Sequence, residues 1–201
     1  FLYSFINFEI ISSIYLYQSD IAFAKETYPT PHVILPGSMN VIYSYDDPTI
    51  SNMAVSNDGL FICRSYIDGH LIITRLEYGK NSTFPNEVII ENFTTELGIK
   101  ECAISSTHFL ALALCGKNVL QFDIGTKRKL PSVTLKFTAK HVVIDDDAAV
   151  IWVAGSQIIS LFSISMTPII EFNTKSEITS ICASPLPEHF ENRFALIGHT
   201  D

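Results

Sequence analysis

Basic residues are scarce in this sequence. It contains 13 lysines and arginines against 21 aspartates and glutamates in 201 residues, which gives a formal net charge of −8 at pH 7. A protein that neutralises phosphates or anionic lipid head groups needs an excess of positive charge. The composition therefore argues against binding to nucleic acid. The only basic run, Lys127-Arg128-Lys129, is interpreted as a solvated loop that follows a strand.

Metal-binding and redox motifs are missing. The cysteines, Cys63, Cys102, Cys115 and Cys182, form no C-x-x-C pair, and the six histidines show neither H-x-x-x-H nor H-x-C spacing. Asp145-Asp146-Asp147 is the most acidic cluster, but it lacks the D-x-D-x-D-G spacing of a calcium loop. We therefore expect no metal and no cofactor. The cluster is interpreted as a hairpin turn and the cysteines as buried, reduced thiols.

Signatures of catalysis and of membrane insertion are absent as well. No G-x-S-x-G elbow and no G-x-G-x-x-G or G-x-x-x-x-G-K phosphate loop occurs. The aromatic stretch Phe1–Tyr17 is shorter than the ~20 apolar residues of a spanning helix, carries Glu9 and follows no positively charged segment. We expect β-structure there, no direct membrane insertion and a non-catalytic protein. A catalytic triad assembled from distant segments stays open.

What the sequence does contain is internal repetition. Each unit shows an apolar strand, a polar turn, a second strand, and a glycine turn followed by more apolar alternation. The units begin at Ile50, Ile99 and Lys140, and a partial unit begins at Glu177. No long amphipathic helix is indicated, because the apolar residues alternate or form short blocks between Gly, Asp, Asn and Pro.

The spacing of the units predicts the architecture. The residues that close the first strand of each unit recur at intervals of 49, 40 and 39 residues; they are Ser56, Ser105, Asp145 and Ser184. Intervals of about 40 to 45 residues are typical of four-stranded propeller blades. We therefore predict an all-β fold, a fragment of a β-propeller with about four blades, the last of them truncated. Its ends are expected to meet further blades of a longer chain.

Turn residues separate the strands of each unit. Asp58-Gly59 and Asp68-Gly69 lie between alternating apolar runs, which predicts type I′ turns with positive φ at both central positions. Left-handed turn conformations are expected for all the glycines that follow second strands. These glycines are Gly69, Gly116, Gly155 and Gly198.

The remaining strands are assigned from apolar runs. Outer strands are predicted at Glu87–Ile90, Val133–Lys136 and Ile169–Phe172, the last two behind connectors that contain Pro131 and Pro168. Trp152 is interpreted as a residue packed between blades. The predicted units span residues 49–98, 99–139 and 140–176, with a partial unit at 177–201.

Residues 1–48 are less regular and are predicted to form a degenerate or partial preceding blade. Strands are expected at Ile10–Tyr17, Ile21–Ala24 and Val41–Tyr45, and Tyr28–His32 is expected to be a proline-bearing loop.

The units resemble WD repeats over about residues 42–201. Ile50–Gly59 is similar to the first strand and turn of that repeat, and Val119–Ile124 is similar to the segment with the family's Trp-Asp pair, with Phe122 in place of Trp. The Trp-Asp pair itself is missing, and no Gly-His precedes the first two full units. The connector Ser165–Pro168, the apolar strand after it and the segment Glu177–Asp201 resemble the C-terminal WD propeller of BEACH-domain proteins.

This resemblance implies a non-catalytic scaffold in vesicle and lysosome-related membrane trafficking. It also implies protein partners and a cytoplasmic location, including the periphery of intracellular membranes. The family's histidine braces a turn, and His199 either does the same or is simply exposed. No family binding residue can be transferred, because such platforms bind through surfaces that differ between members. The loops Lys80–Asn86 and Pro185–Asn192 are candidate binding loops.

Two other function classes stay open. A propeller enzyme would place several ionisable side chains with perturbed pKa values at the mouth of the central channel, where a scaffold would have small and apolar residues. An extracellular, lectin-like propeller would use the sequons Asn81-Ser82-Thr83 and Asn92-Phe93-Thr94 and would need an export signal.

Overall fold

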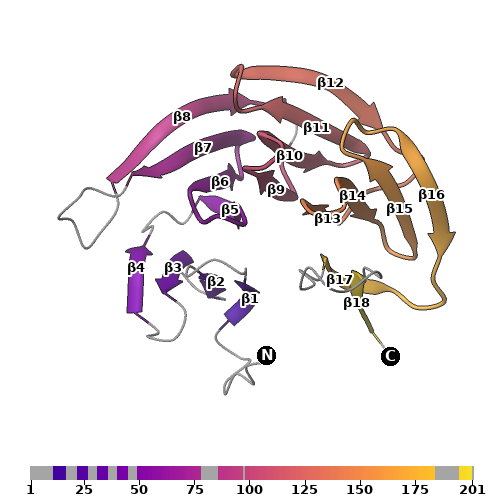
Figure 1. Cartoon of the computed structure of the whole chain (residues 1–201). Coiled ribbons are helices and arrows are strands. Elements are labelled where there is room, and N and C mark those ends of the chain that lie inside the picture. The colour runs from indigo at the N-terminus through magenta and orange to yellow at the C-terminus, as the bar shows by residue number, and fades with distance from the viewer. Residues whose placement is uncertain are drawn as a thin grey trace.

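The computed structural model of the chain is built from β-strands (Figure 1). It describes residues 11–16, 22–26, 31–35, 40–44, 49–77, 86–96, 98–183 and 195–200. All regular elements in these ranges are strands, so the all-β prediction is confirmed. Over the same ranges, no helix has the length and apolar character needed to cross a bilayer.

The strands follow one another along the chain with short connections. They are β1 (Ile11–Leu16), β2 (Ala22–Glu26), β3 (Pro31–Leu35), β4 (Asn40–Ser44), β5 (Ile50–Val55), β6 (Phe61–Tyr66), β7 (His70–Glu77), β8 (Asn86–Thr94), β9 (Glu101–Ser105), β10 (Leu110–Cys115), β11 (Asn118–Asp123), β12 (Arg128–Thr134), β13 (His141–Asp145), β14 (Val150–Ala154), β15 (Ile158–Ser163), β16 (Pro168–Asn173), β17 (Ile178–Ala183) and β18 (Ala195–His199).

Within each sheet, every strand pairs antiparallel with its neighbour in sequence. The first to fourth sheets, β1–β4, β5–β8, β9–β12 and β13–β16, have four strands each, and the fifth sheet pairs β17 with β18. The sheets fan around a common centre, with β5, β9, β13 and β17 innermost and β8, β12 and β16 outermost (Figure 1). Innermost strands of successive sheets are in contact, β5 with β9, β9 with β13 and β13 with β17.

The strand register reproduces the alignment of repeats made from the sequence. The backbone N–H of Ser56 donates to the carbonyl of Phe61 at 2.9 Å, and Ser105 and Asp145 lie opposite Leu110 and Val150. The first hairpin of each of these sheets therefore closes through an equivalent connection, made of residues 57–60, 106–109 and 146–149. The fourth aligned residue, Ser184, lies outside the described residues.

The conformation of the Asp-Gly turns differs from the prediction. Positive φ occurs only at the glycines, with 70° at Gly59 and 91° at Gly69. Gly59 donates its N–H to Ser56 O at 2.8 Å, and Gly69 donates to Tyr66 O at 3.1 Å. The type I′ prediction is therefore wrong. Each connection instead tightens through one ordinary turn that ends on a left-handed glycine, which also accommodates the twist of the strands.

The glycines after the second strands do not all serve the same purpose. Gly116 is left-handed, with φ of 63°, as predicted. The left-handed prediction is wrong at Gly155 and Gly198, which have no positive φ. A Cβ at Gly155 would lie 2.7 Å from Phe137 Cδ2, and one at Gly198 would lie 2.5 Å from Ser180 Oγ. A side chain at either position would therefore force neighbouring groups to move, because they approach the backbone closely.

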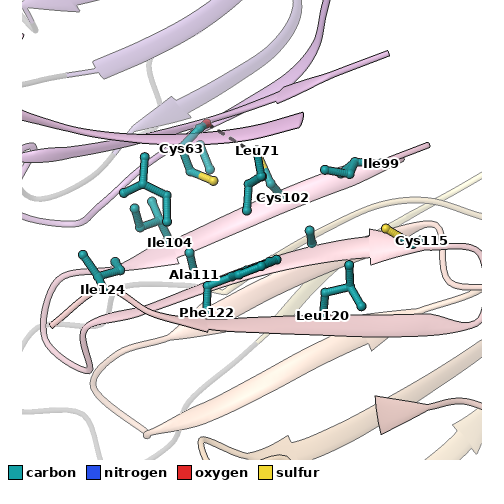
Figure 2. Packing of buried hydrophobic residues seen from close by; sticks show 13 residues of the cluster. Cys63, Leu71, Ile99, Cys102, Ile104, Ala111, Cys115, Leu120, Phe122 and Ile124 are labelled. Carbon is teal, nitrogen blue, oxygen red and sulfur yellow. Dashed lines mark hydrogen bonds between the residues drawn. The ribbon is translucent and has the colours of Figure 1, made fainter. Parts of the chain in front are cut away.

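Apolar cores fill the spaces between facing sheets. In the core between the second and third sheets, Cys63 and Leu71 point toward Cys102, Ile104 and Phe122 (Figure 2). The Phe122 ring is fully buried, with its centroid 4.3 Å from that of Phe93 on β8. Burial of this kind contributes roughly 25 cal/mol per Å² of apolar surface. A similar core joins the third and fourth sheets, and Trp152 is half-buried between the fourth and fifth, as predicted.

One outer strand lies earlier in the sequence than predicted. β12 runs from Arg128 to Thr134 instead of from Val133 to Lys136, so it includes Pro131 and two residues of the basic run. Those basic residues are exposed, as expected, but they belong to a strand and not to a loop. Proline is tolerated because β12 is an edge strand with a register shift between Val119 and Gln121. The side chain of Gln121 also donates to Pro131 O at 2.7 Å.

The N-terminal sheet has one strand more than predicted. β3 begins at Pro31 and includes His32, two residues that the sequence assigns to a loop. Proline is allowed at the first residue of a strand, where no ladder hydrogen bond depends on its missing N–H. The signal that predicts a break therefore marks the start of a strand here.

One face of the fourth sheet is only partly covered. Phe172 lies opposite Ile159, the position that Phe93 takes opposite Leu71 in the second sheet. Phe93 packs on Phe122 of the next sheet, whereas Phe172 is 36% and its neighbour Ile170 is 56% exposed. β17 contacts β13 and β14. Ile159 of β15 is also buried in one core with Ile178 and Ile181 of β17, so the fifth sheet covers this face as far as β15 and leaves its outer part, at β16, open.

Candidate functional site

Polar side chains from the first hairpin turns of three sheets meet at one end of the molecule. Asn57 Nδ2 donates to Asp146 Oδ2 at 2.7 Å, although these residues belong to the second and fourth sheets. His108, from the third sheet between them, has its Nε2 at 3.0 Å from the backbone carbonyl oxygen of Asp146. With the residues that position them, these side chains form the inner-turn cluster, defined as Asn57, Ser105, His108, Asp145 and Asp146.

The repeat itself positions this cluster. Ser105 and Asp145 occupy equivalent positions at the ends of β9 and β13. The Ser105 hydroxyl accepts from the N–H of His108 at 3.0 Å, and Asp145 Oδ1 accepts from the N–H of Ala148 at 3.0 Å. Side-chain oxygens that accept from the backbone a few residues later are typical of tight turns. Because each turn is fixed to its own strand end, the side chains that follow are directed toward the neighbouring turns.

Asp146 is the electrostatically unusual member of the cluster. It is 9% exposed, and its Oδ1 atom is buried without a hydrogen-bond partner. Burial raises the pKa of Asp146, and repulsion from the carboxylates of Asp147 and Asp145 raises it further. The Ser105 hydroxyl and the His108 ring act in the opposite direction on this pKa. The cluster therefore holds a carboxylate that is more easily protonated than a free aspartate.

The hydrogen bonds that His108 and Asp146 already make limit the reactions in which the cluster could take part. A carbonyl oxygen can only accept, so the bond to Asp146 O places the His108 proton on Nε2. Asp146 Oδ2 is already engaged by Asn57. A carboxylate with a raised pKa beside an imidazole is suited to proton transfer. Over the described part of the chain, no group of three His, Cys, Asp or Glu side chains has the arrangement needed to hold a metal ion.

A second set of polar contacts joins the sheets along the innermost strands. Asn52 Oδ1 on β5 accepts from the N–H of Cys102 at 3.1 Å. Glu101 Oε2 on β9 lies 3.0 Å from His141 Nδ1 on β13. Lys140 forms an ion pair with Glu177, just before β17. These contacts join each pair of neighbouring sheets, from the second to the fifth.

The turn residues singled out from the sequence are dispersed over the structure. Asp58 and Gly59 lie in the first turn of the second sheet, beside Asn57. Asp68, Gly69, Gly116 and Gly155 lie in second turns, at the opposite end of the antiparallel strands. Gly198 and His199 lie inside β18 instead of in a turn, and His199 is exposed. The structure does not bring these eight residues together.

Sequence reasoning missed Asn57 and His108 and treated Asp146 only as part of an acidic turn. A signal was available, because Asn57 and Asp146 both directly follow an aligned strand end. Residues that directly follow the innermost strands of radially arranged sheets lie near the common centre, and Asn57 and Asp146 follow β5 and β13. Of the two loops proposed for binding, residues 80–85 of the first and all of Pro185–Asn192 lie outside the described residues.

No protein-family model matches this chain, and no curated protein sequence matches it.

Proposed function

We propose that this chain is part of a WD-repeat-type β-propeller and that it serves as a non-catalytic platform for binding proteins. The observation that carries the proposal is the succession of four-stranded antiparallel meanders around a common centre, with apolar cores between their faces. Four-stranded blades arranged in this way characterise propellers. Such blades present their turns to solvent at both ends of the ring, where partners dock.

The inner-turn cluster fits a structural part of such a platform. Its three bonded residues come from three successive sheets and engage one another. A catalytic site needs a nucleophile or base with a free direction of attack. In this arrangement Asn57 occupies one oxygen of Asp146, and His108 is bound through Nε2 to a backbone carbonyl.

The assignment to a BEACH-type trafficking scaffold rests on the sequence resemblance of the C-terminal part. Its support is the order of a short connector, an apolar outer strand and the segment from Glu177 onward. A cytoplasmic location and partners among trafficking proteins follow from that proposal. If the fifth sheet is a truncated blade, its outer strands in a longer chain would cover the open outer part of the fourth sheet's face.

A propeller enzyme remains the second candidate, because one observation favours it. The raised pKa of Asp146 at the inner end of the sheets is the kind of feature expected of a catalytic group at a channel mouth. The polar side chains around Asp146 also differ from the small and apolar lining expected of a scaffold.

The experiment compares three arginine substitutions at exposed positions. Thr107→Arg lies in a first turn, Ser156→Arg in a second turn and Ser132→Arg on the outer strand β12. Proteins captured from cytosol by the purified chain are identified, produced separately and titrated against each variant by calorimetry. We expect direct micromolar or tighter binding that one of the two turn variants abolishes and the outer-strand variant leaves unchanged.

The same preparations test the enzyme. They are assayed on panels of esters, phosphoesters and glycosides, with Asp146→Asn as the comparison. Turnover that Asp146→Asn abolishes would overturn the platform in favour of the enzyme. Binding that all three arginine variants leave intact would also contradict it.

A further inference from the structure

A continuous surface runs outward from the inner-turn cluster along the turns of the third sheet. Phe109 directly follows His108, and its carbonyl oxygen accepts from the N–H of Ile124 at 2.8 Å. A Cβ placed on Gly125 would lie 3.9 Å from Cβ and Cγ of Phe109, so this side chain stands beside the turn that leads into β12. The β9–β10 hairpin and the β11–β12 hairpin, the first and third of the sheet, thus meet at Phe109.

Phe109 is exposed, so its side chain buries little apolar area in the fold. The side chain is 52% exposed, and the backbone has φ of 49°. A left-handed conformation is unfavourable by about 1–2 kcal/mol for residues with a Cβ. Aromatic side chains with one face free are frequent anchors of protein–protein contacts, because they bury a large area with few rotatable bonds.

The charge of this surface changes sign from its inner to its outer end. At the inner end, Asp147 is exposed beside Asp146, whose buried Oδ1 atom has no partner. At the outer end lies the exposed run Lys127-Arg128-Lys129. Asp123 is also there, but it accepts from the N–H of Thr126 at 2.9 Å and lies opposite Arg128, so the outer end keeps a positive excess.

We propose that Asp147, Phe109 and Lys127 mark a docking surface for an extended peptide segment of a partner protein. The segment carries a basic side chain toward Asp147, an apolar side chain on Phe109 and an acidic side chain toward Lys127. Complementary charges at the two ends fix the register of such a segment, and the central apolar contact supplies most of the affinity. The proposal rests on the proposed function as a protein-binding platform and specifies its ligand.

The probe is a fluorescein-labelled peptide with two arginines, two leucines and two glutamates in that order, separated by glycine-serine spacers of graded length. Two control peptides replace the arginines by glutamates or the leucines by serines. Binding to the purified full chain is followed by fluorescence anisotropy at low and at physiological salt. We expect the bipolar peptide to bind at least tenfold more tightly than either control peptide at the best spacer length.

Three glycine substitutions form a matched set of variants. Phe109, Lys127 and Ala149 all have left-handed backbones, with φ of 49°, 57° and 53°, so glycine fits each position without strain. Phe109→Gly removes the aromatic ring, Lys127→Gly removes a cation, and Ala149→Gly removes only a methyl group. We expect a tenfold or greater loss of peptide binding with the first, a several-fold loss that salt diminishes with the second, and no change with the third.

The results separate this inference from the platform proposal. Peptide binding that Phe109→Gly leaves unchanged, or that the control peptide with glutamates in place of the arginines matches, overturns the docking surface. A partner identified in the capture experiment that binds Phe109→Gly as it binds the wild type would also overturn it, while leaving the platform intact. Thermal unfolding of each variant verifies that the fold is retained.

Discussion

The first hairpin of one sheet contains a left-handed glycine, and the first hairpins of the next two sheets contain a left-handed residue with a side chain. Phe109 and Ala149 occupy equivalent positions, each the last residue of a first-hairpin connection. In the second sheet, Gly59 adopts the same conformation one residue earlier in the connection. A search for turns by glycine finds Gly59 but not the other two, because the surrounding hairpin holds their backbones in the left-handed conformation despite its cost.

The raised pKa of Asp146 leads to a prediction about stability. The native state binds this proton more readily than the unfolded chain, so the free energy of unfolding falls as pH rises from the ordinary value of 3.8 through the folded pKa. Above both values the protein carries a buried charge that costs stability. Asp146→Asn removes this charge and keeps an oxygen that can accept from Asn57.

We therefore expect Asp146→Asn to raise the free energy of unfolding at pH 7 and to lose this advantage in acid. Urea denaturation at pH 7 and near pH 4 measures both effects. Asp147→Asn, at an exposed neighbouring position, is the matched control and should show a smaller change. A variant that is less stable than the wild type at pH 7 would show that the charge of Asp146 is favourably compensated.

At the scale of elements, alternation and turn residues predict most strands of the three complete units. β5, β6 and β7 lie in the unit that begins at Ile50, and the predicted strand at Ile169–Phe172 lies within β16. Two of the errors occur at prolines. Pro131 and Pro31 both lie inside strands, because an edge position or a strand start removes the need for their missing N–H. Whether a strand is at an edge depends on the tertiary structure, which local sequence does not encode.

Substitutions at Phe122 and Phe172 compare a buried position between two sheets with a partly exposed position on one sheet. Phe122 is fully buried between the second and third sheets, whereas Phe172 lies on the open outer part of the fourth sheet. We expect Phe122→Ala to lower the free energy of unfolding by about 3–5 kcal/mol, because it leaves a cavity between two sheets. Phe172→Ala should cost about 1 kcal/mol or less.

Chemical denaturation of both variants measures the difference, and Phe122→Leu serves as a smaller step at the same site. A cost for Phe172→Ala equal to that of Phe122→Ala would mean that the outer part of the fourth sheet is covered in solution. Equal small costs would mean that Phe122 does not join the two sheets as its contact with Phe93 indicates.

For the whole molecule, the sequence predicts the order of the sheets better than the contacts between them. The repeat interval can be read from the sequence alone, and it places Ser56, Ser105 and Asp145 at equivalent strand ends. The bond from Asn57 to Asp146 joins residues 89 positions apart. It exists only because three turns converge on one centre. A contact of this range follows from the curvature of the array, which depends on the packing of every intervening core.

Stability in such an array is a sum of sheet terms and nearest-neighbour interface terms. Asn52→Ala tests this, because Asn52 Oδ1 on β5 accepts from both the N–H and the thiol of Cys102 on β9. Loss of this acceptor leaves a buried amide unsatisfied, at a cost of about 1–3 kcal/mol. We expect hydrogen exchange, measured by mass spectrometry, to accelerate in β5 and β9 and to stay unchanged in β15 and β16. The matched control is Asn92→Ala, at an exposed position on β8.

The strands in which hydrogen exchange accelerates show how the sheets are coupled. If the sheets interact mainly with their neighbours, exchange accelerates only in the second and third sheets. The fourth sheet is then unaffected, because the Glu101–His141 contact and the next apolar core still join it to the third. Uniform acceleration from β5 to β18 would instead mean that the described sheets open as one cooperative unit, as expected if the inner-turn cluster couples the second sheet directly to the fourth. Asn52→Ala and Asp146→Asn together distinguish these cases. Only in the second case should a change at Asp146 alter exchange in β5.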